Sequence, residues 1–167
     1  IIKELLSHYE EYSKVVVYVG AVSHAEHLYQ AMLESPLKAH YDSISFITGR
    51  QNSRGISREA FLEREKTVPR SIVINVDVLT EGYNDPSVNT VVMARPTNSK
   101  LVYMQAMGRA IRRDPANDLK RAFVIEIVDD LPNIQYPINN RWLYSDISDA
   151  LEPDVYDDDF SDETSLR

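Results

Sequence analysis

The sequence predicts an α/β fold in which a parallel sheet of about five strands is flanked by helices. Short segments rich in Val and Ile alternate along the chain with longer amphipathic segments, and polar loops separate the two kinds. Nearly continuous apolar strands are typical of parallel sheets whose two faces are both covered by helices. The clearest example is "KVVVYVG" at residues 14–20, where strand-favouring residues follow Lys14 without a further charge.

The elements are predicted from apolar periodicity and from capping residues. A helix over residues 2–12 comes before the first strand, and Ser23 with Glu26 three residues later forms a capping-box pattern that begins a helix over 23–34. The remaining strands are expected at 43–48, 71–76, 89–95 and 121–128, and the remaining helices at 57–66, capped by Ser57, and from Ser99 to about Ile111.

The 167 residues suffice for one domain with a core, which we expect over residues 1–130. An acidic extension over residues 131–167 follows, for which the pattern predicts no regular structure. Residues 146–167 hold nine acidic side chains and one Arg, which accounts for the whole net charge of −8. The rest of the chain has 17 acidic and 17 basic side chains, so its charge does not argue against a polyanionic partner.

Composition limits the compartment and the kinds of site. The absence of cysteine excludes disulfides and thiolate metal sites and favours a reducing, cytoplasmic location. No apolar run is long enough to span a bilayer, so no membrane association is expected. The four histidines show no metal-ligand spacing, so no metal site is predicted. The chain begins with Ile and carries no secretory signal, so we expect it to be part of a longer protein.

The stretch "YMQAMGRAIRRDP" at residues 103–115 contains the most unusual helix pattern. Arg109 and Arg112 are three residues apart and would share one helix face, with Gln105 nearby on that face. Gly108 costs about 1 kcal/mol in a helix interior, which suggests that a chain segment or a ligand approaches it closely. The arginine fork suits phosphate oxygens. On spacing alone, a solvated basic helix end remains the favoured alternative.

Two polar loops are further candidates. In "VLTEGYNDP" at residues 78–86, Thr80 and the amides beside Gly82 could hold a phosphate, and Asn84 or Asp85 could accept a hydrogen bond from a ribose hydroxyl; an ordinary turn is the alternative.

The loop "TGRQNSRG" at residues 48–55 offers Arg50 and Arg54 to a nucleic-acid backbone, or is merely solvated. Ligands of such sheets usually lie beyond the carboxyl ends of the strands. We therefore expect residues 20–23, 48–55 and 77–87, together with 105–113, to form the site.

In combination, these stretches resemble a known family. The run "VVVYVGAVSHAEHLYQAM", then "TGR", "VLTEGYNDP" and "ARPTNSKLVYMQAMGRAIRR", is similar to motifs IV, IVa, V and VI in the second, C-terminal RecA-like domain of superfamily 2 DEAD/DEAH-type helicases and translocases. The resemblance covers about residues 10–130, and its "Q-x-x-G-R-x-x-R" element is highly specific. It implies the second motor domain of an ATP-dependent helicase, an NTP hydrolase.

The resemblance also implies roles for individual residues. Arg112 would be the arginine finger, Arg109 its partner on the same phosphate, and Gln105 the residue that positions the attacking water. The remaining implied contacts are with the nucleotide, at Gly82, Asn84, Asp85 and Gly108, and with nucleic acid, at Thr80, Ser23, Gly49 and Arg50. Many relatives carry an acid where this chain has Asn84, which leaves open whether Asn84 or Asp85 binds the ribose.

The sequence contains neither a G-x-x-x-x-G-K-[ST] phosphate loop nor a D-E-x-[HD] box. The family carries both in an N-terminal RecA-like domain, so ATP and Mg²⁺ would be bound only in the full-length protein, and the isolated chain is expected to be inactive. The implied partners are that domain and nucleic acid, DNA rather than RNA. A non-catalytic RecA-like docking module is the alternative. A dinucleotide enzyme is disfavoured because "VGAVSHAE" lacks a G-x-G-x-x-G turn.

Overall fold

A computed structural model describes residues 1–79, 83–95, 97 and 99–127 of the chain. Five strands form one sheet in the order β2-β3-β1-β4-β5, and every neighbouring pair is parallel. Their bounds are β1 Lys14–Val19, β2 Ser43–Ile47, β3 Ser71–Asn75, β4 Thr90–Ala94 and β5 Phe123–Glu126. The predicted sheet is therefore confirmed, and each strand lies within its predicted range. The acidic extension predicted over 131–167 lies outside the described residues.

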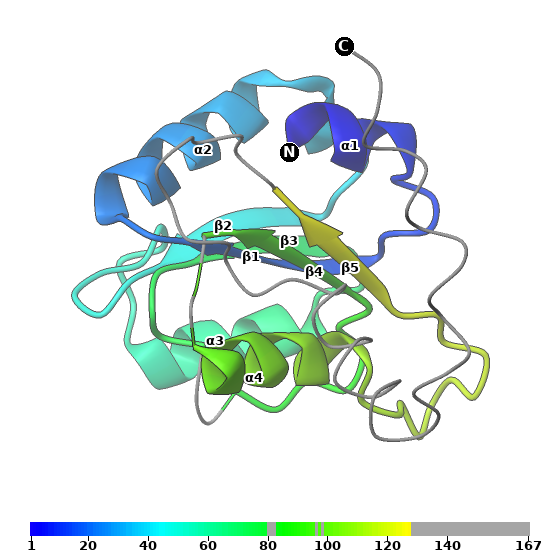
Figure 1. Cartoon of the computed structure of the whole chain (residues 1–167). Coiled ribbons are helices and arrows are strands. Elements are labelled where there is room, and N and C mark those ends of the chain that lie inside the picture. Colours follow the sequence, from blue (N-terminus) through cyan, green and yellow to red (C-terminus); the bar gives the residue numbers. More distant parts are fainter. Residues whose placement is uncertain (80–82, 96, 98, 128–167) are drawn as a thin grey trace, which may run out of the picture.

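Helices cover both faces of the sheet, as Figure 1 shows. One face carries α1 (Ile2–Ser7), α2 (Val22–Glu34) and the short 3₁₀ helix η1 (Pro36–Ala39), and the other carries α3 (Arg58–Thr67) and α4 (Lys100–Ala110). None of the helices in the described part of the chain is both long and apolar enough to cross a membrane.

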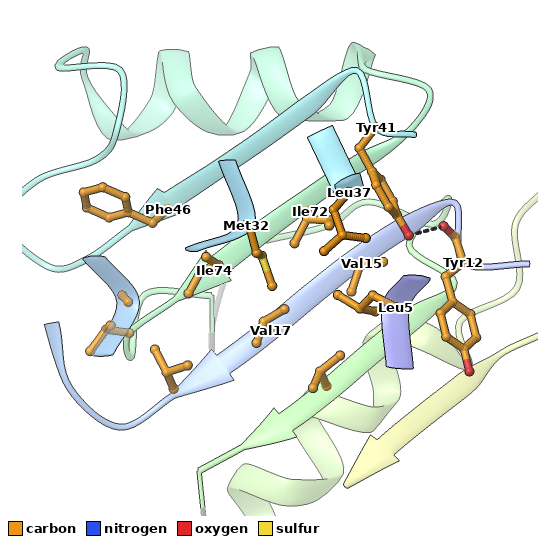
Figure 2. Packing of buried hydrophobic residues seen from close by; sticks show 14 residues of the cluster. Leu5, Tyr12, Val15, Val17, Met32, Leu37, Tyr41, Phe46, Ile72 and Ile74 are labelled. Atoms are coloured by element: carbon orange, nitrogen blue, oxygen red, sulfur yellow. Dashed lines mark hydrogen bonds between the residues drawn. The ribbon is translucent and has the colours of Figure 1, made fainter. Parts of the chain in front are cut away.

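The central strand β1 divides its side chains between two cores. Val15, Val17 and Val19 belong to the cluster beneath α1 and α2, which also contains Leu5 and Met32 (Figure 2). Val16 and Tyr18 belong to the cluster on the α3 and α4 side. Because successive strand residues point to opposite faces, a strand buried on both faces is apolar along most of its length. This burial is the physical reason for the continuous apolar run.

The helix starts agree with the predicted caps in only one of two cases. The Ser57 hydroxyl accepts a hydrogen bond from the Ala60 amide at 3.2 Å, so Ser57 caps α3 as predicted. The predicted cap of α2 by Ser23 is wrong, because α2 begins at Val22, its N-cap is Ala21 and no side chain caps it. Ser23 therefore lies in the first turn of the helix, with an exposed side chain.

The end of α4 differs from the prediction in a way that affects the site. The helix ends at Ala110 and Ile111 is its C-cap, so Arg112 lies outside it. The expectation that Arg109 and Arg112 share one helix face is therefore wrong.

The position of this end also affects the site. Because α4 follows the carboxyl end of β4 and runs back across the sheet, its last turn lies near the amino ends of the strands (Figure 1). The last turn of α4 therefore lies away from the carboxyl ends of the strands, where ligands of such sheets usually bind. We call the two ends of the sheet the carboxyl edge and the amino edge.

Candidate functional site

The segment from Tyr83 to Val88 is held at the amino edge by a buried ion pair. Lys14, the first residue of β1, places its ammonium 2.9 Å from Asp85 Oδ2, and the two residues are only 4% and 7% exposed. The same ammonium donates to the carbonyls of Glu65 at 3.3 Å and Lys66 at 2.7 Å, at the end of α3. Three oxygens thus saturate the three donors of Lys14.

Both carboxylate oxygens of Asp85 are engaged within the chain. The Tyr83 hydroxyl donates to Oδ2 at 3.1 Å, and the Ser87 amide donates to Oδ1 at 3.0 Å. Burial alone would raise the pKa of Asp85, but the hydrogen bonds from Ser87 and Lys14 prevail and hold it below its ordinary value. Burial, together with the charge of Asp85, raises the pKa of Tyr83. Asp85 is therefore an ionised anchor, whereas its neighbour Asn84 is exposed.

Arg109 is directed into the protein. It is 9% exposed, and its guanidinium donates to the Tyr83 carbonyl, which joins α4 to the segment 83–88. Its Nε is buried and has no partner among the described residues. Burial raises the pKa of Tyr18, and the neighbouring charge of Arg109 opposes that shift. In this arrangement the buried side chain of Arg109 holds the segment 83–88 through its backbone.

Arg112 has the opposite environment. It is exposed, and its guanidinium donates to the amide oxygen of Asn84, so these two candidate residues lie together. Gln105 is half-exposed, and its side chain makes no hydrogen bond within the described part of the chain. The result is an accessible cation flanked by amide side chains.

Gly108 has open space around it. A Cβ atom built there would meet no atom within 4 Å, so the expected close approach by another segment of this chain is not found among the described residues. The close neighbour of Gly108 that the sequence predicts would then be a ligand or another domain.

At the carboxyl edge two of the candidate nucleic-acid residues, Gly49 and Arg50, line a groove of about 600 Å³. It is lined by residues that follow β1, β2 and β3: Val22, Thr48, Gly49, Arg50, Gln51, Val76, Asp77 and Val78. Gly49 and Arg50 are exposed there, and Ser23 is adjacent in sequence to a lining residue. Thr80 and Gly82 lie outside the described residues.

The second arginine of the 48–55 loop is not available to a ligand in this structure. Arg54 forms an ion pair with Glu65 at 2.9 Å and donates to the Ser43 hydroxyl at 2.6 Å. Glu65 is itself only 1% exposed. Arg54 therefore anchors the loop to β2 and α3, and leaves Arg50 as its exposed cation.

The structure thus separates the predicted residues into two groups. Asn84, Asp85, Gln105, Gly108, Arg109 and Arg112 lie on or beside α4 and the segment 83–88, and Ser23, Gly49 and Arg50 lie at the carboxyl edge. Lys14 was not predicted as a functional residue. The signal that could have identified it is a charged residue at the start of an otherwise apolar strand. In the described part of the chain, no group of three or more His, Asp or Glu residues could hold a metal ion.

Comparison with known sequences points to one family. Residues 1–114 match the helicase conserved C-terminal domain. The chain is 29% identical over 122 residues to the type I restriction enzyme EcoKI endonuclease subunit of Escherichia coli, and 25% identical over 67 residues to the putative ATP-dependent helicase IRC3 of Saccharomyces cerevisiae. These alignments include 70% and 40% of this chain but only 10% of each relative.

Solved structures show the same fold at low identity. A fragment of a putative HsdR subunit of a type I restriction enzyme from Vibrio vulnificus superposes with a TM-score of 0.60 at 22% identity, covering 75% of this chain and 25% of that one. The C-terminal domain of the DEAD-box protein Dbp5 gives 0.55 at 20% identity, covering 91% and 78%. Domain 2 of the DEAD-box helicase Mss116p, bound to an RNA duplex, gives 0.57 at 18%, covering 90% and 62%. The predicted RecA-like fold is therefore confirmed.

Proposed function

Because the chain belongs to the family of helicase conserved C-terminal domains, we propose that it is the second motor domain of an ATP-dependent nucleic-acid helicase or translocase. The family membership and the fold support this proposal directly. The chain spans about a tenth of the curated relatives that it matches. An N-terminal RecA-like domain of the same protein would supply the other half of the ATP site.

The observation that carries the proposal is the position of Arg112. It is an exposed cation just beyond α4, and its guanidinium contacts Asn84. A guanidinium keeps its charge near neutral pH and bonds well to phosphate oxygens. Arg112 would act as an arginine finger toward the terminal phosphate of ATP held by the N-terminal domain. Asn84, beside it, would bind a ribose hydroxyl in place of the acid found in many relatives.

The neighbouring residues fit supporting roles. Gln105, whose side chain makes no hydrogen bond among the described residues, would orient the attacking water, and the open space at Gly108 would admit the nucleotide or the facing domain. Arg109 would reach a phosphate only by leaving the Tyr83 carbonyl, so in this arrangement it holds the segment 83–88 in place. Asp85 has the same anchoring role through Lys14.

ATP and Mg²⁺ would be bound by the full-length protein. An exposed arginine hydrogen-bonded to the side-chain amide of Asn84 fits the outer side of a nucleotide site, whereas the sequence contains neither the phosphate loop nor the acidic box. ATP hydrolysis would supply the free energy for opening the two domains. The isolated chain would not turn over ATP.

The carboxyl-edge groove would hold the nucleic acid. Arg50, Ser23 and Thr80 are residue types that contact phosphates, and the Gly49 backbone amide adds a further donor. We propose DNA rather than RNA as the substrate, because one relative is a type I restriction enzyme subunit. A cytoplasmic location is proposed from the absence of cysteine alone. A non-catalytic docking module would have no use for an exposed Arg112 held beside Asn84.

Arg112→Ala in the full-length protein tests the proposal. An arginine finger is worth about 10³- to 10⁵-fold in rate, so we expect a loss of that order in ATP turnover with nucleic-acid affinity little changed. Arg113→Ala is the matched control, because Arg113 is 83% exposed and pairs with the exposed Asp118. An equal loss of turnover and affinity would count against the finger role, as would magnesium-dependent ATP turnover by this chain alone.

A further inference from the structure

The helix does not hold Arg112. Since α4 ends at Ala110 and Ile111 is the C-cap, the backbone of Arg112 lies beyond the last regular turn. Its side chain has one described contact, with Asn84. An arginine finger must place its charge accurately at a phosphate, because misplacement by about 1 Å can cost about 100-fold in rate. Its backbone therefore needs support beyond the end of the helix.

Lys120 supplies that definition from eight residues further along the chain. Its ammonium donates to the carbonyl of Arg112 at 2.6 Å, to Pro86 at 2.6 Å and to Val88 at 2.9 Å. An ammonium has three donors, and all three are used here. The contact ties the backbone of Arg112 to the segment that carries Asn84, so the guanidinium and the carbonyl of Arg112 both attach to residues 84–88.

The intervening loop is folded so that it returns Lys120 to this place. Asp114 accepts from the Ala116 amide at 2.9 Å, the Asn117 amide donates to the Asp114 carbonyl at 3.1 Å, and the Lys120 amide donates to the Asn117 carbonyl at 3.2 Å. These local bonds make the loop a compact turn. The hydrogen bonds of this turn therefore fix the position of Lys120.

The charge of Lys120 is subject to opposing effects. A cation near the carboxyl end of a helix interacts favourably with the terminal carbonyls. Burial, together with the charge of Arg112, nevertheless lowers the pKa of Lys120, and the carboxylates of Asp114 and Asp85 oppose that shift.

We propose that Lys120 is a positioning residue for the nucleotide site: its ammonium fixes the backbone of Arg112 against residues 86–88 and so sets where the arginine finger points. This inference rests on the proposed function, because it concerns the same finger. Lys120 itself touches no nucleotide in this scheme. Its removal changes the turnover that Arg112 supports and leaves substrate affinity in place.

The test measures nucleic-acid-stimulated ATP turnover of the full-length protein carrying Lys120→Met, which keeps the apolar stem and removes the donors. We expect kcat to fall by about 10- to 100-fold while the KM for ATP and the affinity for nucleic acid stay near wild type. Lys120→Arg keeps a cation with several donors and should recover part of the loss. Lys38→Met is the control, since Lys38 is an exposed lysine on η1, on the other face of the sheet.

A double-mutant cycle separates positioning from general destabilisation. If Lys120 acts through Arg112, adding Lys120→Met to Arg112→Ala should change kcat by less than about twofold, because the interaction is already lost. Independent effects that multiply would overturn the inference, as would a wild-type kcat in Lys120→Met. If Lys120→Met does not fold, Lys120→Gln, which retains a neutral donor, is judged by the same criteria.

The Arg112→Ala variant distinguishes failure of the positioning role of Lys120 from failure of the proposed function. Slow turnover in Arg112→Ala with normal turnover in Lys120→Met overturns the positioning role alone. Normal turnover in Arg112→Ala overturns the proposed function, and the inference with it.

Discussion

The two edges of the sheet are built on different principles. At the carboxyl edge, Gly49 and Arg50 are exposed around an open groove of about 600 Å³. At the amino edge, the segment 83–88 is anchored from both sides, by Lys14 through Asp85 and by Lys120 through backbone carbonyls. One edge contains an open groove, and the other is cross-linked by lysines.

This difference corresponds to what each edge would have to do. Contacts to a phosphate backbone are sequence-independent and spread over many groups, so each contributes modestly and tolerates movement. An arginine finger must place one charge accurately at one phosphate, which requires pre-organised support. The difference between the edges predicts that substitutions at the amino edge act on stability and turnover, whereas those at the carboxyl edge act on nucleic-acid affinity.

The largest effect on stability is expected from Lys14→Met. It leaves Asp85 as a buried carboxylate without its cation, and removing one member of a buried ion pair costs about 3–5 kcal/mol. Urea unfolding of the chain measures the change. Lys3→Met on α1 is the control, because Lys3 is exposed, and its unfolding midpoint should not move. A loss below about 1 kcal/mol for Lys14→Met would mean that the amino edge is not cross-linked by this pair.

Arg54→Ala should follow with a loss of about 2–3 kcal/mol, since the buried Glu65 would keep only the Ser43 hydroxyl as a described partner. The same unfolding experiment tests this value. Arg54 and Arg50 belong to one loop, so the comparison with Arg50→Ala isolates the effect of the partner. Equal stability of the two variants would contradict the assignment of Arg54 as an anchor.

Acid should lower the free energy of unfolding through protonation of Asp85 at the amino edge. Its folded pKa lies below the ordinary 3.8, because the hydrogen bonds from Ser87 and Lys14 outweigh the effect of burial. A depressed carboxyl pKa contributes stability that is present above the unfolded pKa and is lost as pH falls through the folded pKa. The stability difference between wild type and Asp85→Asn should therefore shrink below about pH 4. Unfolding curves at pH 6, about 4 and about 3 measure it, and a constant difference would contradict the expectation.

The smallest effect on stability is expected at the open edge. Arg50→Ala should leave the unfolding midpoint unchanged, because no hydrogen bond or ion pair of its side chain is found among the described residues. In the full-length protein it should weaken nucleic-acid binding and lower the slope of affinity against salt concentration by about one. A large loss of stability in Arg50→Ala, or an unchanged salt slope, would contradict the predicted difference between the two edges.

Much of the fold follows from local patterns. The apolar runs predict the positions of all five strands because strands of a parallel sheet covered on both faces are mostly apolar. Ser57 is found as a cap because its bond to the Ala60 amide involves residues only three apart. Ser23 showed the same pattern and failed, since α2 begins at Val22. Capping patterns specify where a helix is able to start, and packing selects among the possible starts.

The candidate site follows less completely. The order of the motifs was enough to predict the family and to select the candidate site residues, and the family membership is confirmed. Spacing, however, treated Arg109 and Arg112 as equivalent, and treated Arg50 and Arg54 alike. In each pair the structure leaves one arginine exposed and engages the other with a distant partner. Lys14 and Lys120 could not be assigned a role from sequence, because their partners are defined only by the folded chain.

The sequence by itself thus determined the α/β class, the parallel sheet and the family, because periodicity and motif order are properties of residues close together along the chain. Only the tertiary structure decided which charges are buried and paired and which face outward. The contacts of Asp85 with Lys14 and of Asn84 with Arg112 join residues 71 and 28 positions apart. No local pattern encodes such pairs, since they depend on how the sheet and helices bring distant segments together and on the cost of burying a charge without a partner.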